Sequence, residues 1–193
     1  MFVPEPVKVL NMEKRWFSKL LGGAKSRRLE TTQARADEGL ADAQFSLGLQ
    51  FASVKGGVPD YAQAVRWYLL AANQNHAMAQ FNLGIMLAEG QGVPRDDAGS
   101  EKWMRRAAQQ GDAGAQHNMG SRHRRASFKA PPAVALESNL EAYKWFSLAA
   151  AQDYRGSDMA FESVALGLTP EQVAEGDGRA AAFTVVSPGI VQS

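Results

Sequence analysis

The hydrophobic positions of the chain fall into blocks that predict pairs of packed helices. Ala43, Leu47 and Phe51 are spaced by four residues, which places them on one face of a helix. A Gly-Val-Pro-Asp segment at residues 57–60 then ends that helix, because proline disfavours helical backbone at the residue before it. The next helix is expected to bury a second set of small and aromatic residues, Ala64, Trp67, Tyr68, Ala71 and Ala72.

Both blocks recur along the chain at a fixed period. The segment ADAQFSLG at residues 41–48 aligns with AMAQFNLG at residues 77–84 and with AGAQHNMG at residues 113–120, a spacing of 36 residues each time. Three tryptophans mark the second block: Trp67, Trp103 and Trp145. They are 36 and then 42 residues apart, so the third unit holds six extra residues. Three copies at one period predict a helical repeat protein.

Two local signals refine the predicted helix pairs. Asp60 and Asp96 stand before the second helices of the first two units and are expected to be their N-caps, as is Ser138 or Asn139 in the third. The first helix of every unit also has a glycine near its middle, which costs roughly 1 kcal/mol relative to alanine. We therefore expect a neighbouring helix to approach closely at these positions, Gly48, Gly84 and Gly120.

The combined pattern of A-x-A-Q-x-x-L-G, G-V-P-x-D-x-x-x-A and W-x-x-x-A-A over residues 41–154 resembles the Sel-one-like repeat family, a 36-residue relative of the tetratricopeptide repeats. The resemblance implies an all-α fold, a right-handed α-solenoid of antiparallel helix pairs that forms a tetratricopeptide-like superhelix. It also implies a scaffold or adaptor that binds other proteins, of a kind found in many bacteria. The third unit departs from the pattern, because residues 121–125 replace the expected tyrosine and Gly-Val-Pro loop.

The repeats and their flanks divide the chain into four predicted parts. Residues 169–172 match a capping box with proline at the first helical position, and Gly176 and Gly178 are expected to weaken the helix that follows. The predicted parts are an N-terminal extension at 1–26 with a short amphipathic helix at 12–21, a solenoid at 27–168 with full units at 41–76, 77–112 and 113–154, a C-terminal capping helix at 169–183, and a flexible tail at 184–193.

Composition narrows the classes of protein that fit the chain. Thirty-two of its 193 residues are alanine, which favours helix. The chain has no cysteine and so no disulfide, thiolate zinc site or cysteine nucleophile. No run of about 18 apolar residues predicts a transmembrane helix, and no secretory signal is recognisable, so we expect a cytoplasmic protein. A net charge of +1 gives no overall field that would attract nucleic acid.

Candidate catalytic and metal-binding residues are few. The histidines His76, His117 and His123 lack the paired spacing of a metalloprotease motif, and no serine has the strand-to-helix context of a nucleophile elbow. We therefore predict no catalytic residue, no metal and no cofactor, and a protein that is not an enzyme. The alternative is a peptidoglycan- or β-lactam-related enzyme, a description that some cysteine-rich, secreted relatives of the family carry.

A dense basic cluster lies in the third unit, at residues 122–129. It could be a nucleic-acid patch or a kinase site at Ser127. No aromatic residues alternate with its charges to stack on bases, so we expect a solvated insertion loop and no nucleic acid.

The N-terminal extension has an apolar face that needs a partner. Trp16, Phe17, Leu20 and Leu21 form that face, with basic residues around it. We expect such a helix to cover the open end of the solenoid; the alternatives are that it lies on an anionic membrane surface or that the segment is disordered. A membrane-recruited adaptor is therefore the alternative to a freely diffusing one.

The resemblance also implies where a partner protein would bind. In tetratricopeptide-like superhelices the first helix of each unit lines the concave groove through its positions 5, 6, 9 and 13. Repeated along a stack, these positions suit an extended segment or a helix of another protein. The alternative is that Phe45 and Phe81 fill the gaps between adjacent units. The twelve groove positions are Phe45, Ser46, Leu49 and Ser53, then Phe81, Asn82, Ile85 and Glu89, then His117, Asn118, Ser121 and Arg125.

Overall fold

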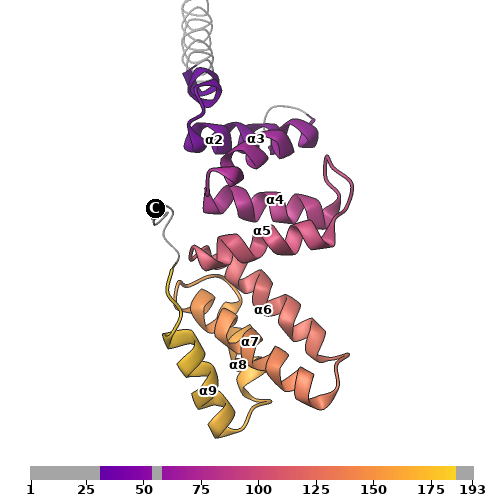
Figure 1. Cartoon of the computed structure of the whole chain (residues 1–193), viewed down its shortest axis with the longest axis vertical. Coiled ribbons are helices and arrows are strands. Elements are labelled where there is room, and N and C mark those ends of the chain that lie inside the picture. The colour runs from indigo at the N-terminus through magenta and orange to yellow at the C-terminus, as the bar shows by residue number, and fades with distance from the viewer. Residues whose placement is uncertain (1–30, 54–57, 186–193) are drawn as a thin grey trace, which may run out of the picture.

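The helices follow one another in antiparallel pairs that stack along the long axis of the molecule (Figure 1). The structure is a computed structural model and describes residues 31–53 and 58–185. Residues 31–37 are helical. The following helices are α2 (Ala41–Ala52), α3 (Tyr61–Asn73), α4 (Ala77–Glu89), α5 (Asp97–Gln109), α6 (Ala113–Ser127), α7 (Pro132–Ala150), α8 (Ser157–Ala165) and α9 (Pro170–Ala181).

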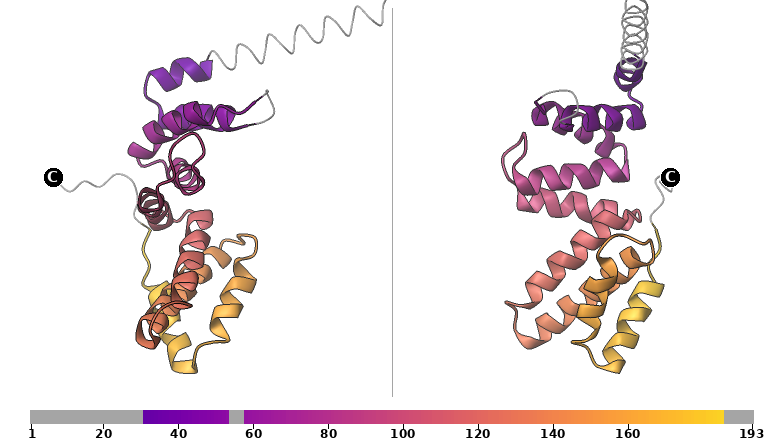
Figure 2. Two further views of the ribbon diagram at one scale, coloured as in Figure 1. Left: turned by 90° about the vertical axis from the view of Figure 1, so that its right-hand side faces the viewer. Right: turned by 180° about the vertical axis from the view of Figure 1, so that it is seen from behind.

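Each predicted unit is one pair of helices in the structure. The pairs are α2 with α3, α4 with α5 and α6 with α7, and each pair also packs on the next (Figure 1). Helices α8 and α9 both pack against α7 and close the C-terminal end of the stack (Figure 2). The described residues form helices and turns but no strand. The prediction of an all-α solenoid is therefore confirmed.

The glycine in each first helix allows the second helix of the same unit to come close. A Cβ atom added to Gly84 would lie 3.0 Å from the Met104 side chain, and one added to Gly120 would lie 2.7 Å from the Phe146 ring. A Cβ atom on Gly48 would overlap the ring of Tyr68. The expected close approach is confirmed, and it explains why these helices carry a residue that weakens them.

A buried glutamine joins each first helix to the second helices on both sides. Gln80 Nε2 in α4 donates to the carbonyl oxygen of Ala72 in α3 at 3.1 Å, and Gln80 Oε1 accepts from Gln110 Nε2, just after α5, at 2.7 Å. Gln44 and Gln116 make the equivalent pair of bonds in their own units. These three side chains are at most 4% exposed, so the bonds satisfy polar groups that water does not reach.

The second helix of the third unit starts differently from the second helices of the first two units. Asp60 and Asp96 are N-caps, as predicted, and accept backbone N–H bonds at 3.0 and 2.9 Å. The prediction for the third unit is wrong, because α7 starts at Pro132 and contains Ser138 and Asn139. Proline fits the first helical position, and no glycine or proline interrupts the chain between it and Asn139. Helix α7 has 19 residues, six more than α5.

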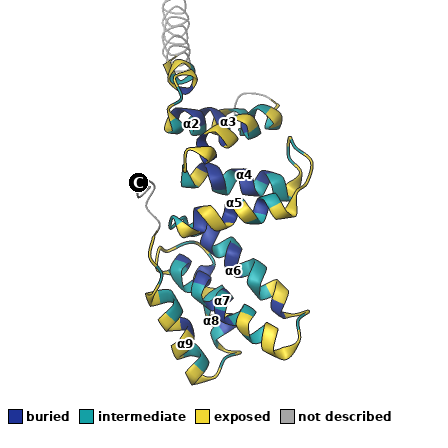
Figure 3. Cartoon of the chain, in the orientation of Figure 1, coloured by how far each residue is buried: buried dark blue, intermediate teal, exposed yellow. Residues whose placement is uncertain are grey.

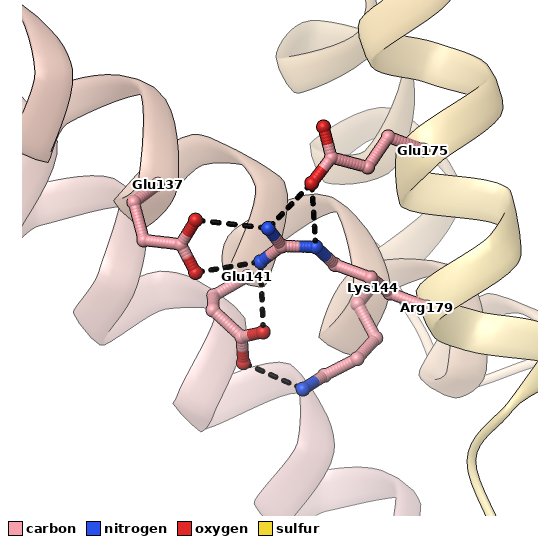
Figure 4. Close-up of polar contacts among 5 residues, drawn as sticks. All are labelled: Glu137, Glu141, Lys144, Glu175 and Arg179. Atoms are coloured by element: carbon pink, nitrogen blue, oxygen red, sulfur yellow. Dashed lines mark hydrogen bonds and ion pairs between the residues drawn. The ribbon is translucent and has the colours of Figure 1, made fainter.

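The C-terminal helix α9 is fixed to this longer helix. Thr169 caps α9 with the predicted capping box. Gly176, which we expected only to weaken the helix, is buried where a Cβ atom would lie 2.5 Å from the Tyr143 ring of α7. Arg179 reaches across to α7 and pairs with both oxygens of Glu137, at 2.6 and 2.9 Å, and with Glu141 at 3.3 Å (Figure 4). The extra turns of α7 thus provide part of the binding surface for α9.

The core runs as a thin strip between the helices, and much of each outer face is exposed (Figure 3). Small residues such as Ala64, Ala107 and Ala149 are fully buried there. The chain after α9 returns to the third unit, where the Phe183 ring meets the edge of the Trp145 ring with centroids 5.6 Å apart. Phe183 thus packs against the part of the core that contains Trp145 of α7.

Candidate protein-binding surfaces

The ring at position 5 of the first two units lies at the joint with the following unit. The Phe45 ring stacks on His76, the N-cap of α4, with centroids 4.5 Å apart. A Cβ atom on Gly114, at the start of α6, would lie 2.8 Å from the Phe81 ring. Both phenylalanines remain partly exposed. They therefore contact the next unit, as the gap-filling alternative expects, and also present an edge at the surface.

His117 takes the same place in the third unit. Its Nδ1 lies 2.9 Å from Ser157 Oγ at the start of α8, and its ring meets the edge of Phe146 with centroids 5.2 Å apart. Burial lowers the pKa of His117 below its ordinary value of 6.5. The ring at position 5 thus joins the last full unit to α8.

The polar side chains at position 6 are held in fixed orientations. Ser46 Oγ donates to the carbonyl oxygen of Asp42 at 2.7 Å, and Asn118 Nδ2 donates to that of Gly114 at 2.9 Å. Asn82 instead bonds to the hydroxyl of Tyr68 in α3, whose pKa burial raises to about 12. All three position 6 side chains are partly exposed.

Positions 9 and 13 are the more open part of the predicted groove. Leu49 is 45% exposed, while Ile85 and Ser121 are partly buried. At position 13, Glu89 and Arg125 are exposed, and Ser53 is the C-cap of α2. The positions therefore range from half-buried rings at position 5 to solvent-facing side chains at position 13.

A separate cleft of about 760 Å³ opens between the second and third units, at the ends of α4 and α6 and the start of α5. Ala88 and Met119 contribute apolar surface to it, and Phe128 stands at its side with 70% of its surface exposed. Its charged residues are Arg95, Asp97, Glu101, Arg122, Arg125 and Lys129. The basic cluster of the third unit is visible in the sequence, but no local pattern predicts that it faces the second unit across a cleft.

Two carboxylates neutralise part of this basic cleft. Glu101 accepts hydrogen bonds from Arg105 at 2.7 Å and from Arg122 at 2.6 Å. Both guanidinium groups lower the pKa of Glu101, and the hydrogen bond from Arg105 has the largest effect. Arg95 forms two bonds of 3.0 Å with Asp97 and lowers the pKa of that carboxyl. Both carboxylates are therefore negatively charged at neutral pH.

The basic cluster is helical, which corrects the expected insertion loop. Arg122, Arg124 and Arg125 lie within α6, because no glycine or proline ends this helix where the first two units have their Gly-Val-Pro segment. Ser127 is 7% exposed, and its hydroxyl donates to the carbonyl oxygen of Arg124 at 2.8 Å. The hydroxyl is thus held inside the end of the helix and does not form an open kinase site.

The repeat geometry agrees with a family of known proteins. The model of the Sel1 repeat family matches residues 41–76, 77–112 and 113–154, the three units that the sequence predicts. The chain belongs to the Sel1 repeat family. Sel1 repeats are generally protein–protein interaction modules, and their solenoid is typically a binding scaffold without catalytic function.

Solved structures that are similar to this Sel1 repeat chain include two crystal structures. One is c5321, a protective antigen of uropathogenic Escherichia coli strains that displays an SLR fold, with 27% identity over 80% of this chain and a TM-score of 0.68. The other is a Sel1 repeat protein from Oxalobacter formigenes, with 29% identity over 71% of this chain and 98% of its own length, and a TM-score of 0.58. The chain spans 32% of c5321. No curated protein matches the sequence.

Other candidate sites in the Sel1 repeat chain can be compared with the structure. Among the described residues, no group of three or more histidine, aspartate or glutamate side chains could hold a metal ion. No helix in the described ranges is long and apolar enough to cross a membrane. The predicted N-terminal helix, with its apolar face of Trp16, Phe17, Leu20 and Leu21, lies outside the described residues.

Proposed function

We propose that this Sel1 repeat chain is a scaffold that binds an extended segment or a helix of a partner protein along the first helices of its units. The main support is that α2, α4 and α6 carry similar side chains at equivalent places. Each has a half-buried ring at position 5 and a small polar group at position 6, and two of the three have an aliphatic residue at position 9. Because the units repeat along the stack, we expect these places to form a continuous stripe.

The exposed residues of this stripe are suited to binding. A partner that covered Leu49, which is 45% exposed, would remove apolar surface from water at about 25 cal/mol per Å². The rings of Phe45 and Phe81 are already ordered by contacts with the next unit, so these side chains lose little entropy when a partner packs against their exposed edges. The stripe therefore combines preorganised rings with open aliphatic and polar groups.

Three finer points stay predictions. A cytoplasmic location rests on the sequence pattern, and membrane recruitment rests on Trp16 and its apolar neighbours, outside the described residues. The sequence has neither the histidine spacing of a metalloprotease motif nor a serine in a nucleophile elbow, and on this ground we propose binding without catalysis.

Affinity capture with matched variants tests the proposal. Leu49→Lys places a charge on the stripe, whereas Leu70→Lys places the same charge on α3 at a residue that is 47% exposed. The full chain should capture a defined set of proteins from its source cells, the Leu49 variant should lose them, and the Leu70 variant should retain them. Equal capture by both variants, with unchanged helix content, would contradict the proposed surface.

A further inference from the structure

The cleft between the second and third units exists because these units end differently. In the second unit, Gly90 and Gly92 have left-handed backbone, and the loop folds back toward the preceding unit. A Cβ atom on Gly92 would overlap the backbone of Tyr61, so this loop packs against the start of α3 (Figure 1). The third unit has no such loop, and α6 continues to Ser127. The start of α5 is therefore left open beside the end of α6.

The open charges of the cleft are positive. Arg95 and Arg122 are paired with the carboxylates of the cleft, whereas Arg125 and Lys129 have no ion pair within the described part of the chain. A shallower hollow of about 470 Å³ continues along α5 and adds Lys102 and Arg106. The whole chain has a net charge of only +1, so this local excess is a property of the surface rather than of the composition.

An exposed aromatic residue stands beside these charges. Phe128 is the C-cap of α6, and the Arg124 guanidinium lies over its ring at 4.7 Å from the centroid. Arg124 also donates to Asn139 of α7 at 3.0 Å, which holds the guanidinium in place. One open face of the Phe128 ring is thus oriented beside the cleft by neighbouring side chains.

We propose that the cleft binds an acidic, extended segment of a partner protein that carries an aromatic or aliphatic residue to pack on Phe128. The segment's carboxylates would pair with Arg125 and Lys129, the two cations that lack an ion pair among the described residues. Asp97 and Glu101 line the same cleft and would repel a uniform polyanion such as duplex DNA. This inference rests on the proposed scaffold function but uses a different surface, which shares only Arg125 with the stripe.

The test measures binding of a labelled peptide to the full chain by fluorescence anisotropy. The probe is a peptide of about ten residues, in which acidic residues alternate with serines on both sides of one central phenylalanine, long enough to span the cleft when extended. Arg125→Glu with Lys129→Glu should weaken binding at least about tenfold at about 0.15 M salt. Phe128→Ser, at an exposed position, should weaken it by about threefold.

A matched pair of substitutions controls for net charge. Arg66→Glu with Arg155→Glu changes the charge by the same amount at exposed residues that do not line the cleft, and should leave the affinity unchanged within about twofold. Equal losses in both charge-reversal variants would overturn the proposal. Tighter binding of a DNA duplex through the same residues would overturn it too, as would self-association of the chain that Arg125→Glu abolishes.

The failure of this inference can be separated from the failure of the scaffold function. Leu49→Lys should leave peptide binding unchanged, because Leu49 is not part of the cleft. If the peptide does not bind but protein capture still depends on Leu49, only the cleft assignment is wrong. If the peptide binds at the cleft but Leu49→Lys has no effect on capture, the stripe assignment is wrong.

Discussion

The second and third units have equivalent core contacts but differ at their tips, where the first helix of each unit connects to the second. In both units a glycine of the first helix meets a side chain of the second helix, and a buried glutamine joins three helices. At the tips, α4 ends at a left-handed Gly90 and leads into a loop, whereas α6 runs on to Ser127 and α7 starts early at Pro132.

This difference separates what holds the stack together from what is free to change. The glutamine joints link the start of each first helix to the ends of the second helices, on the side away from the tips, so lengthening the tips of the third unit leaves Gln116 and Gly120 in place. The added turns of α7 instead pair with α9 through Glu137, and the continued α6 forms one wall of the basic cleft. In a solenoid of this kind, local features arise where a unit departs from the repeat.

The glutamine joints should be equally important in both units. Gln80→Leu and Gln116→Leu each remove two hydrogen bonds, one of them to the carbonyl oxygen of a fully buried alanine, so each should lower the free energy of unfolding by about 2–3 kcal/mol. Urea denaturation of the full chain followed by circular dichroism measures the change. A lower free energy of unfolding in only one of the two variants would show that the joints are not equivalent.

The glycine contacts should differ between the two units. A Cβ atom on Gly120 meets the rigid Phe146 ring, whereas one on Gly84 meets the flexible side chain of Met104. Gly120→Ala should therefore cost about 2 kcal/mol, and Gly84→Ala less than about 1 kcal/mol, because the methionine can move and alanine favours helix. The same denaturation experiment decides between them. Equal losses would contradict the packing described.

The ion pairs at the two tips should also differ. Arg179→Ala should cost about 1 kcal/mol, since its partners are partly exposed, and should speed hydrogen exchange in α9. Arg95→Ala, which removes an exposed pair between the loop and the first residue of α5, should leave exchange in the rest of α5 unchanged. Unaltered exchange in α9 would show that Arg179 does not fix the cap.

The smallest expected effect is the pH dependence near neutral pH that comes from the histidines of the third unit. Burial lowers the pKa of His117 in the folded chain below 6.5. Below about pH 6.5 the unfolded chain therefore binds more protons than the folded chain does. The native state consequently loses stability as pH falls. His117→Phe restores the residue type of the first two units and should flatten this slope. His123, whose pKa burial also lowers, should retain part of it. Urea titrations between about pH 5 and pH 8 measure the slope, and an unchanged slope in the variant would exclude His117 as its source.

The units and helix pairs could be predicted from sequence because their signals are local. The repeated A-x-A-Q segment, the helix glycines and N-caps such as Asp60 lie within a few residues of the structure that they specify. The start of α7 was predicted wrongly because Ser138 and Asn139 occupy the repeat's N-cap position. Pro131 and Pro132 already offered an earlier start, with no helix breaker after them.

The binding surfaces depend on distances between units, which no local pattern gives. Phe45 and Phe81 fit both a groove and a packing role in the sequence, and only the structure shows their contacts with His76 and Gly114. To predict the cleft, one must know how the tips of the second and third units lie relative to each other. Its only sequence signal was the missing Gly-Val-Pro segment next to the basic cluster of the third unit.

The central claim is that partner proteins bind along the first helices of the units. Hydrogen-exchange mass spectrometry of the full chain, alone and with a partner identified by affinity capture, tests it most directly. The account predicts slower exchange in α2, α4 and α6 when the partner is bound, with α3 and the C-terminal half of α5 unchanged. Protection that is confined to α3, α5 and α9 would contradict it.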